Sequence, residues 1–290
     1  MSVNNNTNAQ ILVFILLLMF AAANHCQAEP GQASLDKTPL KFGFFPIVST
    51  VALYKRFSPL RNYLSQALER DVTLLTAKDF PTFYQRTQQR HYDIVVTAPH
   101  FAVAAADSGK YRIRSTLTSD VQQLIIVQKN SPIADISELQ GKVIATPPKP
   151  ALITMMGKQF LKNAGIDGDK APVYRSFTSH NAANQALLGG EVDAAIASSN
   201  IVKKAIQRGE PLRIISYGLK LPNMALLVAE DQNPLIGDRL VKALLDLSDS
   251  EKGKAVLKKI SFPGYREVSK EDYEIARPYM EQARAISKNK

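Results

Sequence analysis

Residues 93–99 read DIVVTAP, and an apolar segment that ends at Gly109 comes directly after them. The continuous apolar run predicts a strand over 93–97 that is buried on both faces. Pro99 suits the first turn of a helix, and Gly109 suits the position after its end. The stretch therefore predicts a strand followed at once by a helix, which is typical of a parallel sheet covered by helices.

Strands and helix-like segments alternate in the same way before and after this stretch. The expected strands lie at 40–45, 71–76, 93–97, 112–118, 123–128, 143–145, 173–177, 193–197, 212–217 and 225–229. The expected helices lie at 58–68, 80–90, 99–109, 152–164, 180–188, 200–208, 235–247, 251–258 and 270–287. In the first of these helices, Leu60, Leu64 and Leu68 share one face, with Ser58 as the N-cap and Pro59 in the first helical position.

Two strand–helix series with β-rich connections between them predict an α/β protein of two parallel-sheet lobes joined by two crossing strands. The chain is expected to start in lobe 1, cross into lobe 2 and return. The predicted parts are a signal peptide over 1–28, the first part of lobe 1 over 29–122, lobe 2 with the crossing strands over 123–216, and the return to lobe 1 with the C-terminal helices over 217–290.

The first residues have the pattern of an export signal. The apolar run ILVFILLLMFAAA at 11–23 is shorter than the about 20 residues of a membrane-spanning helix. Small side chains at Cys26 and Ala28 predict cleavage after Ala28 and delivery to the periplasm. His25 before the cysteine argues against lipidation, whereas the absence of Lys and Arg from residues 1–10 leaves an uncleaved anchor as an alternative. After cleavage the chain has no cysteine, which excludes disulfides and thiol chemistry.

The charge balance favours anionic partners. The chain carries 36 Lys and Arg against 26 Asp and Glu, a formal net charge of +10. Small anionic solutes, nucleic acid and anionic lipid would all be attracted. The basic residues are scattered singly or in pairs, whereas a nucleic-acid surface would cluster them, so nucleic acid is not an expected partner. A merely solvated basic surface is the alternative reading of most of these residues.

Polar side chains stand after the predicted strands at their carboxyl ends, where ligands bind in open α/β sheets. These positions are 46–50, 97–100, 146–154, 176–181 and 198–200, and they include His100 and Ser198. They are rich in hydroxyl, amide and imidazole groups and poor in carboxylates, and most precede a helix. Helix N-termini offer free N–H groups and favour anions. The alternative for each residue is a helix cap, and His180 is open to both readings.

The sequence gives little support to catalysis. It has no Gly-x-Ser-x-Gly elbow and no phosphate loop, and Ser179-His180 is a neighbourhood rather than a triad. His91, His100 and His180 lie far apart without acidic or histidine partners at ligand spacing. We therefore expect no catalytic residue, no metal site and no cofactor, and a protein that is not an enzyme.

Four phrases occur in order along the chain. They are the helix from Pro59-Leu60 to Leu68, the stretch YDIVVTAP at 92–99, NSPI at 130–133 followed by ISELQGK at 136–142, and His180 followed by GEVDA at 190–194. Together they resemble the PhnD-like family of phosphate, phosphite and phosphonate ABC transporter substrate-binding proteins. The resemblance runs from about residue 40 to the C-terminal helices.

The resemblance implies a class II type of two-lobed periplasmic-binding-protein fold. In such proteins the lobes close on the ligand, and the loaded protein docks on an ABC permease in the inner membrane. The resemblance also implies ligand contacts at His180, at Thr97 after the third strand, and at Asn200 after the GEVDA strand. A monomer is expected.

Two positions depart from the family pattern. Phosphonate binders carry a Ser-Thr-Ser-Gly-like turn where this chain has TPPKPAL at 146–152, with Lys149 left to supply charge. An acidic contact position falls at Asn223 and Met224, which have no carboxylate. The expected ligand is a phosphonate-, phosphate- or phosphite-like oxyanion, with another small anion or a less charged solute as the alternative.

Three functions are compatible with these features. The first is the solute-binding component of an ABC importer, which closes its lobes on a small oxyanion. The second is a ligand-sensing periplasmic partner of a membrane signalling receptor. The third, an enzyme on the same scaffold, is disfavoured because no nucleophile–base pair or metal set emerges.

Overall fold

The computed structural model describes residues 38–288, and the chain from Thr38 onward forms one compact unit. The predicted signal peptide and its cleavage site lie outside the described residues. Within the described part of the chain, no helix has both the length and the apolar character needed to cross a bilayer.

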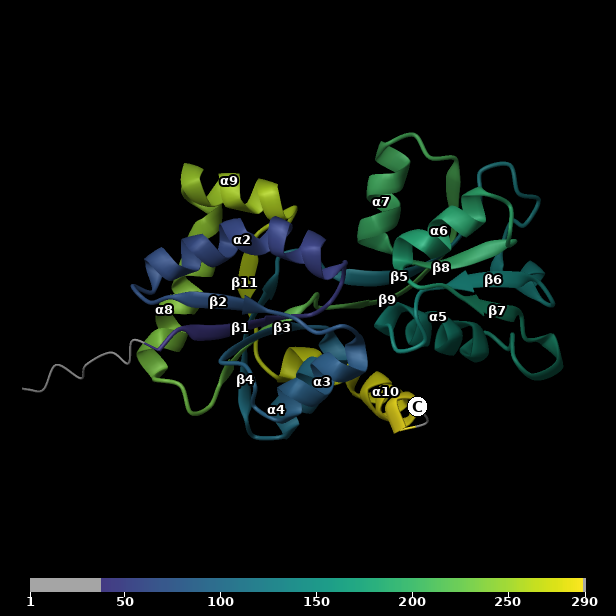
Figure 1. Ribbon diagram of the computed structural model, residues 1–290. Coiled ribbons are helices and arrows are strands. Elements are labelled where there is room, and N and C mark those ends of the chain that lie inside the picture. The colour runs from purple at the N-terminus through teal and green to yellow at the C-terminus, as the bar shows by residue number, and fades with distance from the viewer. Residues whose placement is uncertain (1–37, 289–290) are drawn as a thin grey trace, which may run out of the picture. The chain divides into compact units, whose positions relative to one another are not determined.

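The first sheet has the strand order β11-β4-β10-β3-β1-β2 (Figure 1). Its strands are β1 (Leu40–Phe44), β2 (Val72–Leu75), β3 (Ile94–Thr97), β4 (Tyr111–Leu117), β10 (Ala225–Ala229) and β11 (Tyr265–Glu267). Strands β2, β1 and β3 are parallel, whereas β10 runs antiparallel to β3 and β4, and β11 runs antiparallel to β4. We call this sheet and the helices on it lobe 1.

The second sheet has the order β7-β6-β8-β5-β9. Its strands are β5 (Val121–Gln128), β6 (Val143–Thr146), β7 (Val173–Ser176), β8 (Ala194–Ser198) and β9 (Leu212–Leu221). Strands β7, β6 and β8 are parallel, and β5 runs antiparallel to both β8 and β9. This sheet and its helices form lobe 2. The predicted two-lobed α/β fold is confirmed, but both sheets are mixed, because β10 and β11 in the first sheet and β5 in the second run against the other strands.

The chain leaves the first sheet after β4 and returns to it after β9. The changes of sheet therefore fall at 118–120 and 222–224. The predicted lobe boundaries at 122/123 and 216/217 lie near these points and stay predictions.

Helices cover both faces of each sheet. In lobe 1 they are α2 (Thr50–Ala67), α3 (Phe80–Gln88), α4 (Pro99–Asp107), α8 (Pro234–Leu245), α9 (Glu251–Ile260) and α10 (Arg277–Lys288). In lobe 2 they are α5 (Leu152–Asn163), α6 (His180–Leu188) and α7 (Ser199–Gln207). Short 3-10 segments are η1 (Ile136–Leu139), η2 (Gly168–Lys170), η3 (Asp246–Ser248) and η4 (Glu271–Ala276).

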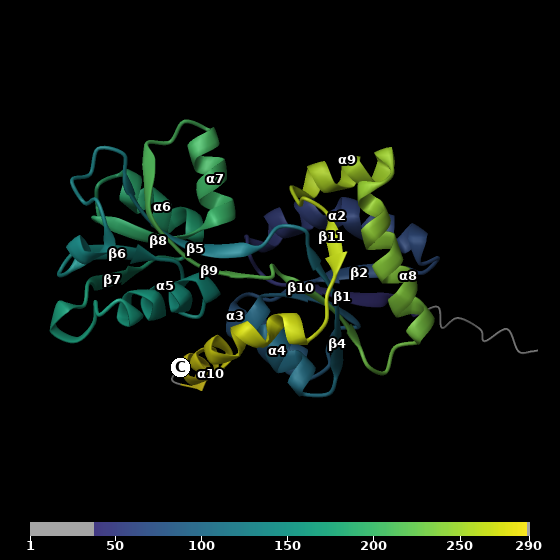
Figure 2. The ribbon, with the colours of Figure 1, turned by 180° about the vertical axis from the view of Figure 1, so that it is seen from behind.

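Figures 1 and 2 show α2, α8 and α9 on one face of the first sheet and α3, α4 and α10 on the other. The C-terminal helix α10 also contacts α5 of lobe 2. Tyr279 and Met280 of α10 belong to the same buried apolar cluster as Met155 and Met156 of α5. Arg277 fixes the start of α10 through an ion pair of 2.6 Å to Asp107 at the end of α4. The apolar core is therefore continuous from one lobe to the other along α10.

Helix α2 differs from the prediction at its start. It begins at Thr50 rather than Ser58, and Pro59 lies inside it. A proline removes the N–H that would bond to the carbonyl four residues earlier and crowds that turn. The carbonyl that loses its helical donor is that of Lys55, while the Ser58 hydroxyl donates to the neighbouring Tyr54 carbonyl at 2.6 Å. The helix nevertheless runs through Pro59, whose preference for a first turn suggested a helix start.

Candidate functional site

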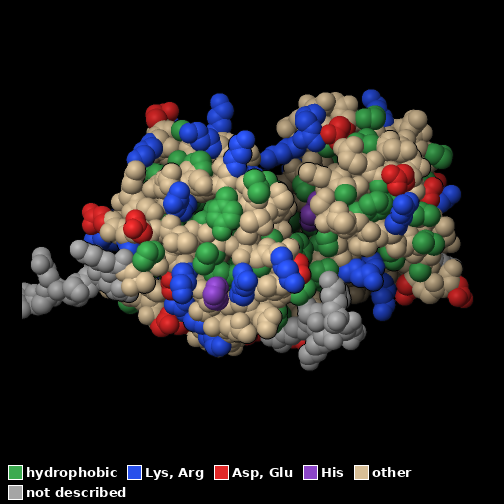
Figure 3. Space-filling model, viewed as in Figure 1, with side chains coloured by type: hydrophobic (Ala, Val, Ile, Leu, Met, Phe, Trp, Pro, Cys, Tyr) green, Lys and Arg blue, Asp and Glu red, His purple; other side chains and the backbone are tan. Residues whose placement is uncertain are grey.

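A cleft of about 1650 Å³ lies between the loops at the carboxyl ends of the strands of the two sheets. Lobe 1 supplies residues that come after β1, β2 and β3, and lobe 2 supplies residues that come after β6, β7 and β8. The space-filling view shows the hollow between the lobes, with a histidine side chain inside it and basic side chains at its upper edge (Figure 3). The cleft therefore occupies the position where α/β sheets bind ligands.

The lobe-1 side of the cleft is mostly apolar. Phe45 and Ile47 come after β1, and Phe80 begins α3 after β2. The rings of Phe45 and Phe80 lie 4.3 Å apart, and Phe45 also meets Phe101 of α4 at 5.7 Å. This packing fixes an apolar surface that we call the lobe-1 wall, defined by Phe45, Ile47 and Phe80. Such a surface gains from contact with an apolar group and offers no hydrogen bond to an anion.

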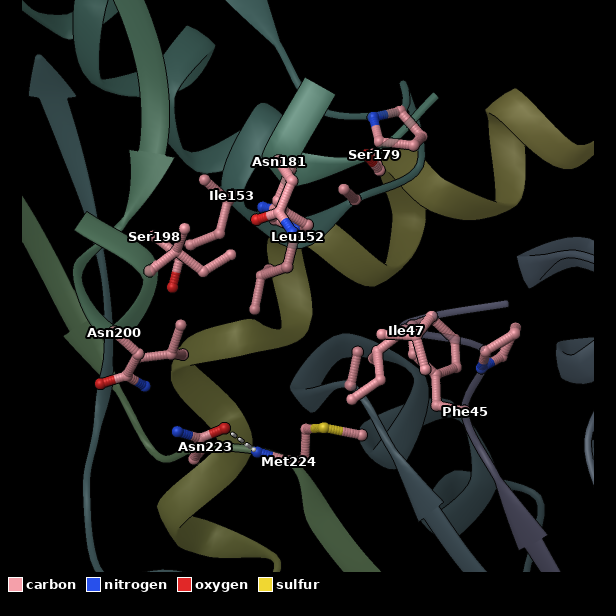
Figure 4. Close-up of a pocket in the computed structure, with 18 of the residues that line it drawn as sticks. Phe45, Ile47, Leu152, Ile153, Ser179, Asn181, Ser198, Asn200, Asn223 and Met224 are labelled. Atoms are coloured by element: carbon pink, nitrogen blue, oxygen red, sulfur yellow. Dashed lines mark hydrogen bonds between the residues drawn. The ribbon is translucent and has the colours of Figure 1, made fainter. Parts of the chain in front are cut away.

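The lobe-2 side of the cleft is mostly polar. Ser179 and Asn181 stand at the start of α6, and Ser198 and Asn200 stand at the start of α7 (Figure 4). Asn223 adds an amide from the segment that leads back to lobe 1, and its Oδ1 accepts from the Met224 N–H at 2.8 Å. We call Ser179, Asn181, Ser198 and Asn200 the lobe-2 wall.

Three helices present uncapped N-termini at the cleft. The N-cap residues of α4, α5 and α7 are Ala98, Ala151 and Ser198, and none makes a side-chain cap hydrogen bond. Alanine has no side chain that can accept such a bond. By contrast, Ser179 caps α6 by accepting from the Ala182 N–H at 3.0 Å. The uncapped ends leave backbone N–H donors, with the positive ends of the helix dipoles, for an anion.

Two hydroxyls near the start of α5 are already engaged. The Thr154 hydroxyl donates to the Pro147 carbonyl at 3.0 Å, and the Ser176 hydroxyl donates to the same carbonyl at 3.2 Å. They hold the proline-containing turn at 147–150 in place. The Ser-Thr-Ser-Gly-like turn of the family pattern is therefore absent from 146–152, and these two hydroxyls donate to the backbone of the turn.

Charged side chains around the cleft are mainly basic. They are Arg56, Lys78, Lys149, Lys203, Lys204, Arg208 and Lys258, against the carboxylates Asp79 and Glu210. Asp79 caps α3 by accepting from the Thr82 N–H at 2.8 Å, and Glu210 pairs with Arg208 at 2.6 Å. Both carboxylates are thus occupied inside their own lobes. The field in the cleft favours negative charge.

Two histidines in the cleft are held neutral. His100 at the start of α4 is fully buried, and burial lowers its pKa to about 3; the Pro150 carbonyl of lobe 2 partly opposes the shift. Among the described residues, neither ring nitrogen of His100 makes a hydrogen bond of normal geometry. Burial also lowers the pKa of His180 to about 4, and its Nδ1 has no partner within residues 38–288. A neutral imidazole can donate one hydrogen bond and accept another.

The structure brings five of the six predicted site residues to the cleft. His100, Lys149, His180, Ser198 and Asn200 all line it. Thr97 does not, because it stands at the end of β3, pairs with Ala225 of β10, and is only 1% exposed. Ligand contact by any of the six stays a prediction.

Sequence reasoning missed several residues of the cleft. Phe80 comes after β2, and the strand-end rule would have found it had it been applied to that strand as well. Ile47 and Leu152 lie within the predicted strand-end segments, but an apolar side chain there carries no sign of a binding site in the sequence. Asn184 reaches the cleft from inside α6, where no strand end marks it. Met224, which the resemblance had placed at a contact position, lines the cleft as well.

Comparison with known proteins identifies the fold and the family. Residues 42–273 match the sequence profile of a family described as "ABC transporter, phosphonate, periplasmic substrate-binding protein". The structure resembles PhnD1 from Prochlorococcus marinus in complex with methylphosphonate, with a TM-score of 0.72 and 17% identity over 86% of this chain and 99% of that one. It also resembles XAC2383 from Xanthomonas citri bound to ATP, with a TM-score of 0.71 and 17% identity over 85% of this chain and 98% of that one.

A third structure, the binding-protein component PA3383 of an ABC phosphonate transporter from Pseudomonas aeruginosa, has a TM-score of 0.67 and 15% identity over 87% of each chain. At these identities the structures show the shared fold, and the sequence profile shows the family. This is a family of transport proteins rather than of enzymes, as the motifs at 92–99 and 130–142 had indicated. The chain belongs to the periplasmic substrate-binding proteins of phosphonate ABC transporters.

Proposed function

We propose that this protein binds a small phosphorus oxyanion of the phosphonate, phosphate or phosphite class in the cleft and delivers it unchanged to an ABC permease in the inner membrane. The proposal includes export through the predicted signal peptide over 1–28. It is supported by the family and by two structural neighbours whose ligands, methylphosphonate and ATP, both carry phosphorus oxyanions.

One observation carries the proposal: the uncapped N-termini of α4, α5 and α7 all open on the same cleft. A tetrahedral oxyanion presents several acceptors at once and can take N–H groups from more than one helix. The basic side chains around the cleft add long-range attraction, and the carboxylates among them are already occupied. The cleft therefore offers donors and positive charge and little that repels an anion.

A pair of substitutions at one residue isolates a backbone donor. Leu152 is the first residue of α5, where proline is tolerated because this N–H has no partner inside the helix. Ala151 before it has φ −70° and ψ 133°, which a following proline accepts. Leu152→Pro removes the side chain and the N–H, whereas Leu152→Ala removes the side chain alone.

We expect Leu152→Pro to bind methylphosphonate about tenfold more weakly than Leu152→Ala, since a hydrogen bond to a charged group contributes about 1.5–3 kcal/mol. Titration calorimetry on the mature protein measures both. Glu251→Pro at the first position of α9, whose residues line the cleft only near its C-terminal end, controls for the effect of a new proline. Equal affinities of the two Leu152 variants, or no melting-temperature increase with phosphate, phosphite or methylphosphonate, would contradict the proposal.

A further inference from the structure

The two sides of the cleft differ in polarity and would therefore suit different parts of one ligand. The lobe-2 wall presents amides, hydroxyls and helix N-termini, whereas the lobe-1 wall of Phe45, Ile47 and Phe80 presents an apolar surface. Met224 stands between them, and its side chain extends toward Phe45 and Ile47 (Figure 4). If the ligand were a small anion that contacted only lobe 2, the apolar lobe-1 wall would stay exposed to water after the lobes close.

The described residues that line the cleft include two carboxylates, and both already have partners in their own lobes. Asp79 accepts the cap hydrogen bond of α3, and Glu210 pairs with Arg208. Asn223 and Met224, at the segment that returns to lobe 1, carry no charge. A ligand with an ammonium group would therefore lose water around that group and meet mainly basic side chains around the cleft.

The packing of the lobe-1 wall also favours an organic substituent. The Phe45 ring is held by Phe80 at 4.3 Å and by Phe101 at 5.7 Å, so its apolar surface is fixed before a ligand arrives. A preorganised apolar surface favours binding because little freedom is lost.

Resting on the proposed function, we propose that the cleft selects an organophosphorus anion that carries an apolar organic substituent and no ammonium group. The phosphorus oxyanion lies against the helix N-termini and the lobe-2 wall, and the organic substituent lies against the lobe-1 wall and Met224. The apolar contact adds affinity that inorganic phosphate and methylphosphonate cannot obtain.

Four probes test this assignment by calorimetry on the mature wild-type protein: phenylphosphonate, methylphosphonate, 2-aminoethylphosphonate and inorganic phosphate. We expect phenylphosphonate to bind at least about tenfold more tightly than methylphosphonate, because two buried methylene equivalents already give that factor. We expect 2-aminoethylphosphonate to bind no more tightly than methylphosphonate. Equal affinities for phenylphosphonate and methylphosphonate, or preferential binding of 2-aminoethylphosphonate, overturn the assignment while leaving the proposed function intact.

Ile47→Asn locates the preference on the lobe-1 wall. Ile47 is half-buried on a loop, and its replacement is expected to bring the ratio of the phenylphosphonate and methylphosphonate affinities close to one. Val51→Asn, 80% exposed on α2 and outside the cleft, is the matched control and should keep the wild-type ratio. Ile47→Ala serves as a second variant if Ile47→Asn does not fold. An unchanged ratio in a folded Ile47 variant contradicts the assignment, and failure of all four probes to bind overturns both proposals.

Discussion

The lobe-1 wall and the lobe-2 wall arise from the same local architecture and differ in the residues that come after each strand. Both are built from segments between a parallel strand and the start of a helix. Ile47 comes after β1 and Phe80 after β2, whereas Ser198 ends β8 and Asn200 follows it. The parallel strand–helix unit determines where each wall lies. The first residues of each connection determine whether the wall is apolar or polar.

Lobe 2 places two uncapped helices, α5 and α7, beside this polar surface, whereas lobe 1 contributes one, α4, and its α3 is capped by Asp79. Lobe 2 should therefore account for most of the anion affinity, and lobe 1 for the choice of substituent. Four further changes test this division, from the largest expected effect to the smallest.

A carboxylate placed on the lobe-2 wall should have the largest effect. Asn200→Asp puts a negative charge at the start of α7, and like charges at short range in a partly buried site repel strongly. We expect the affinity for methylphosphonate to fall about a hundredfold or more, which corresponds to about 2.7 kcal/mol. Titration calorimetry measures this change in affinity. Asn200→Ala separates loss of the amide from the added charge, and Asn62→Asp on the exposed side of α2 should leave binding unchanged.

The position of α5 depends on one glycine. A Cβ on Gly157 would stand 2.4 Å from Ile196 of β8, so helix and sheet can approach this closely only without a side chain. Gly157→Ala is expected to lower the free energy of unfolding by about 1–3 kcal/mol. Urea denaturation measures the loss, and Lys162→Ala on the exposed face of α5 is the control. A variant as stable as the wild type would show that the α5 N-terminus is not fixed in this way.

The buried histidine of lobe 1 predicts a loss of stability in acid. The folded-state pKa of His100 is about 3, below the unfolded value of about 6.5, so the unfolded chain binds more protons between these values. Stability is complete above about pH 6.5 and falls as the pH drops toward 3, by about 2 kcal/mol at pH 5 from this residue. His100→Leu should therefore lose less stability than the wild type between pH 7.5 and 5.

Denaturant titrations at the two pH values measure the difference. His91→Leu, at an exposed position outside the cleft, is the control and should keep the wild-type pH dependence. An equal loss in the wild type and His100→Leu would mean that His100 is not buried as a neutral group.

The exposed lysines at the edge of the cleft should have the smallest effect. Lys203 and Lys204 of α7 line the cleft and make no ion pair with any described residue. We expect the double alanine variant to bind methylphosphonate about threefold more weakly at low salt, with no difference at about 0.5 M salt, because screening removes such interactions. Lys55→Ala combined with Lys162→Ala, outside the cleft, is the control. A loss that persists at high salt would place one of these lysines in direct contact with the ligand.

The sequence predicted most elements of the fold because apolar runs and their stop signals are local. The helix over 180–188 and the strand over 225–229 match α6 and β10 at both ends. The predicted start of α2 was wrong, because the helix continues through Pro59, a residue whose usual place is the first helical turn. Strand β11 was missed, because three residues at a sheet edge carry too little pattern.

The site was harder to predict than the fold. Strand ends pointed to His100, His180, Ser198 and Asn200, which do line the cleft. The same rule pointed to Thr97, but this residue pairs with Ala225 inside the sheet and its side chain is buried. Phe45 looks like an ordinary core residue in the sequence, and only the packing of the two lobes shows that it faces a shared space.

The C-terminal helix α10 is a third connection between the lobes, besides β5 and β9. It contacts both α4 and α5, and it lies on the opposite side of β5 and β9 from α7 (Figures 1 and 2). When the lobes swing about the two strands, α10 must slide over α5 or move with it. A fluorophore near the end of this helix would then report opening and closing without touching the ligand, while a bulky C-terminal tag would restrain the swing.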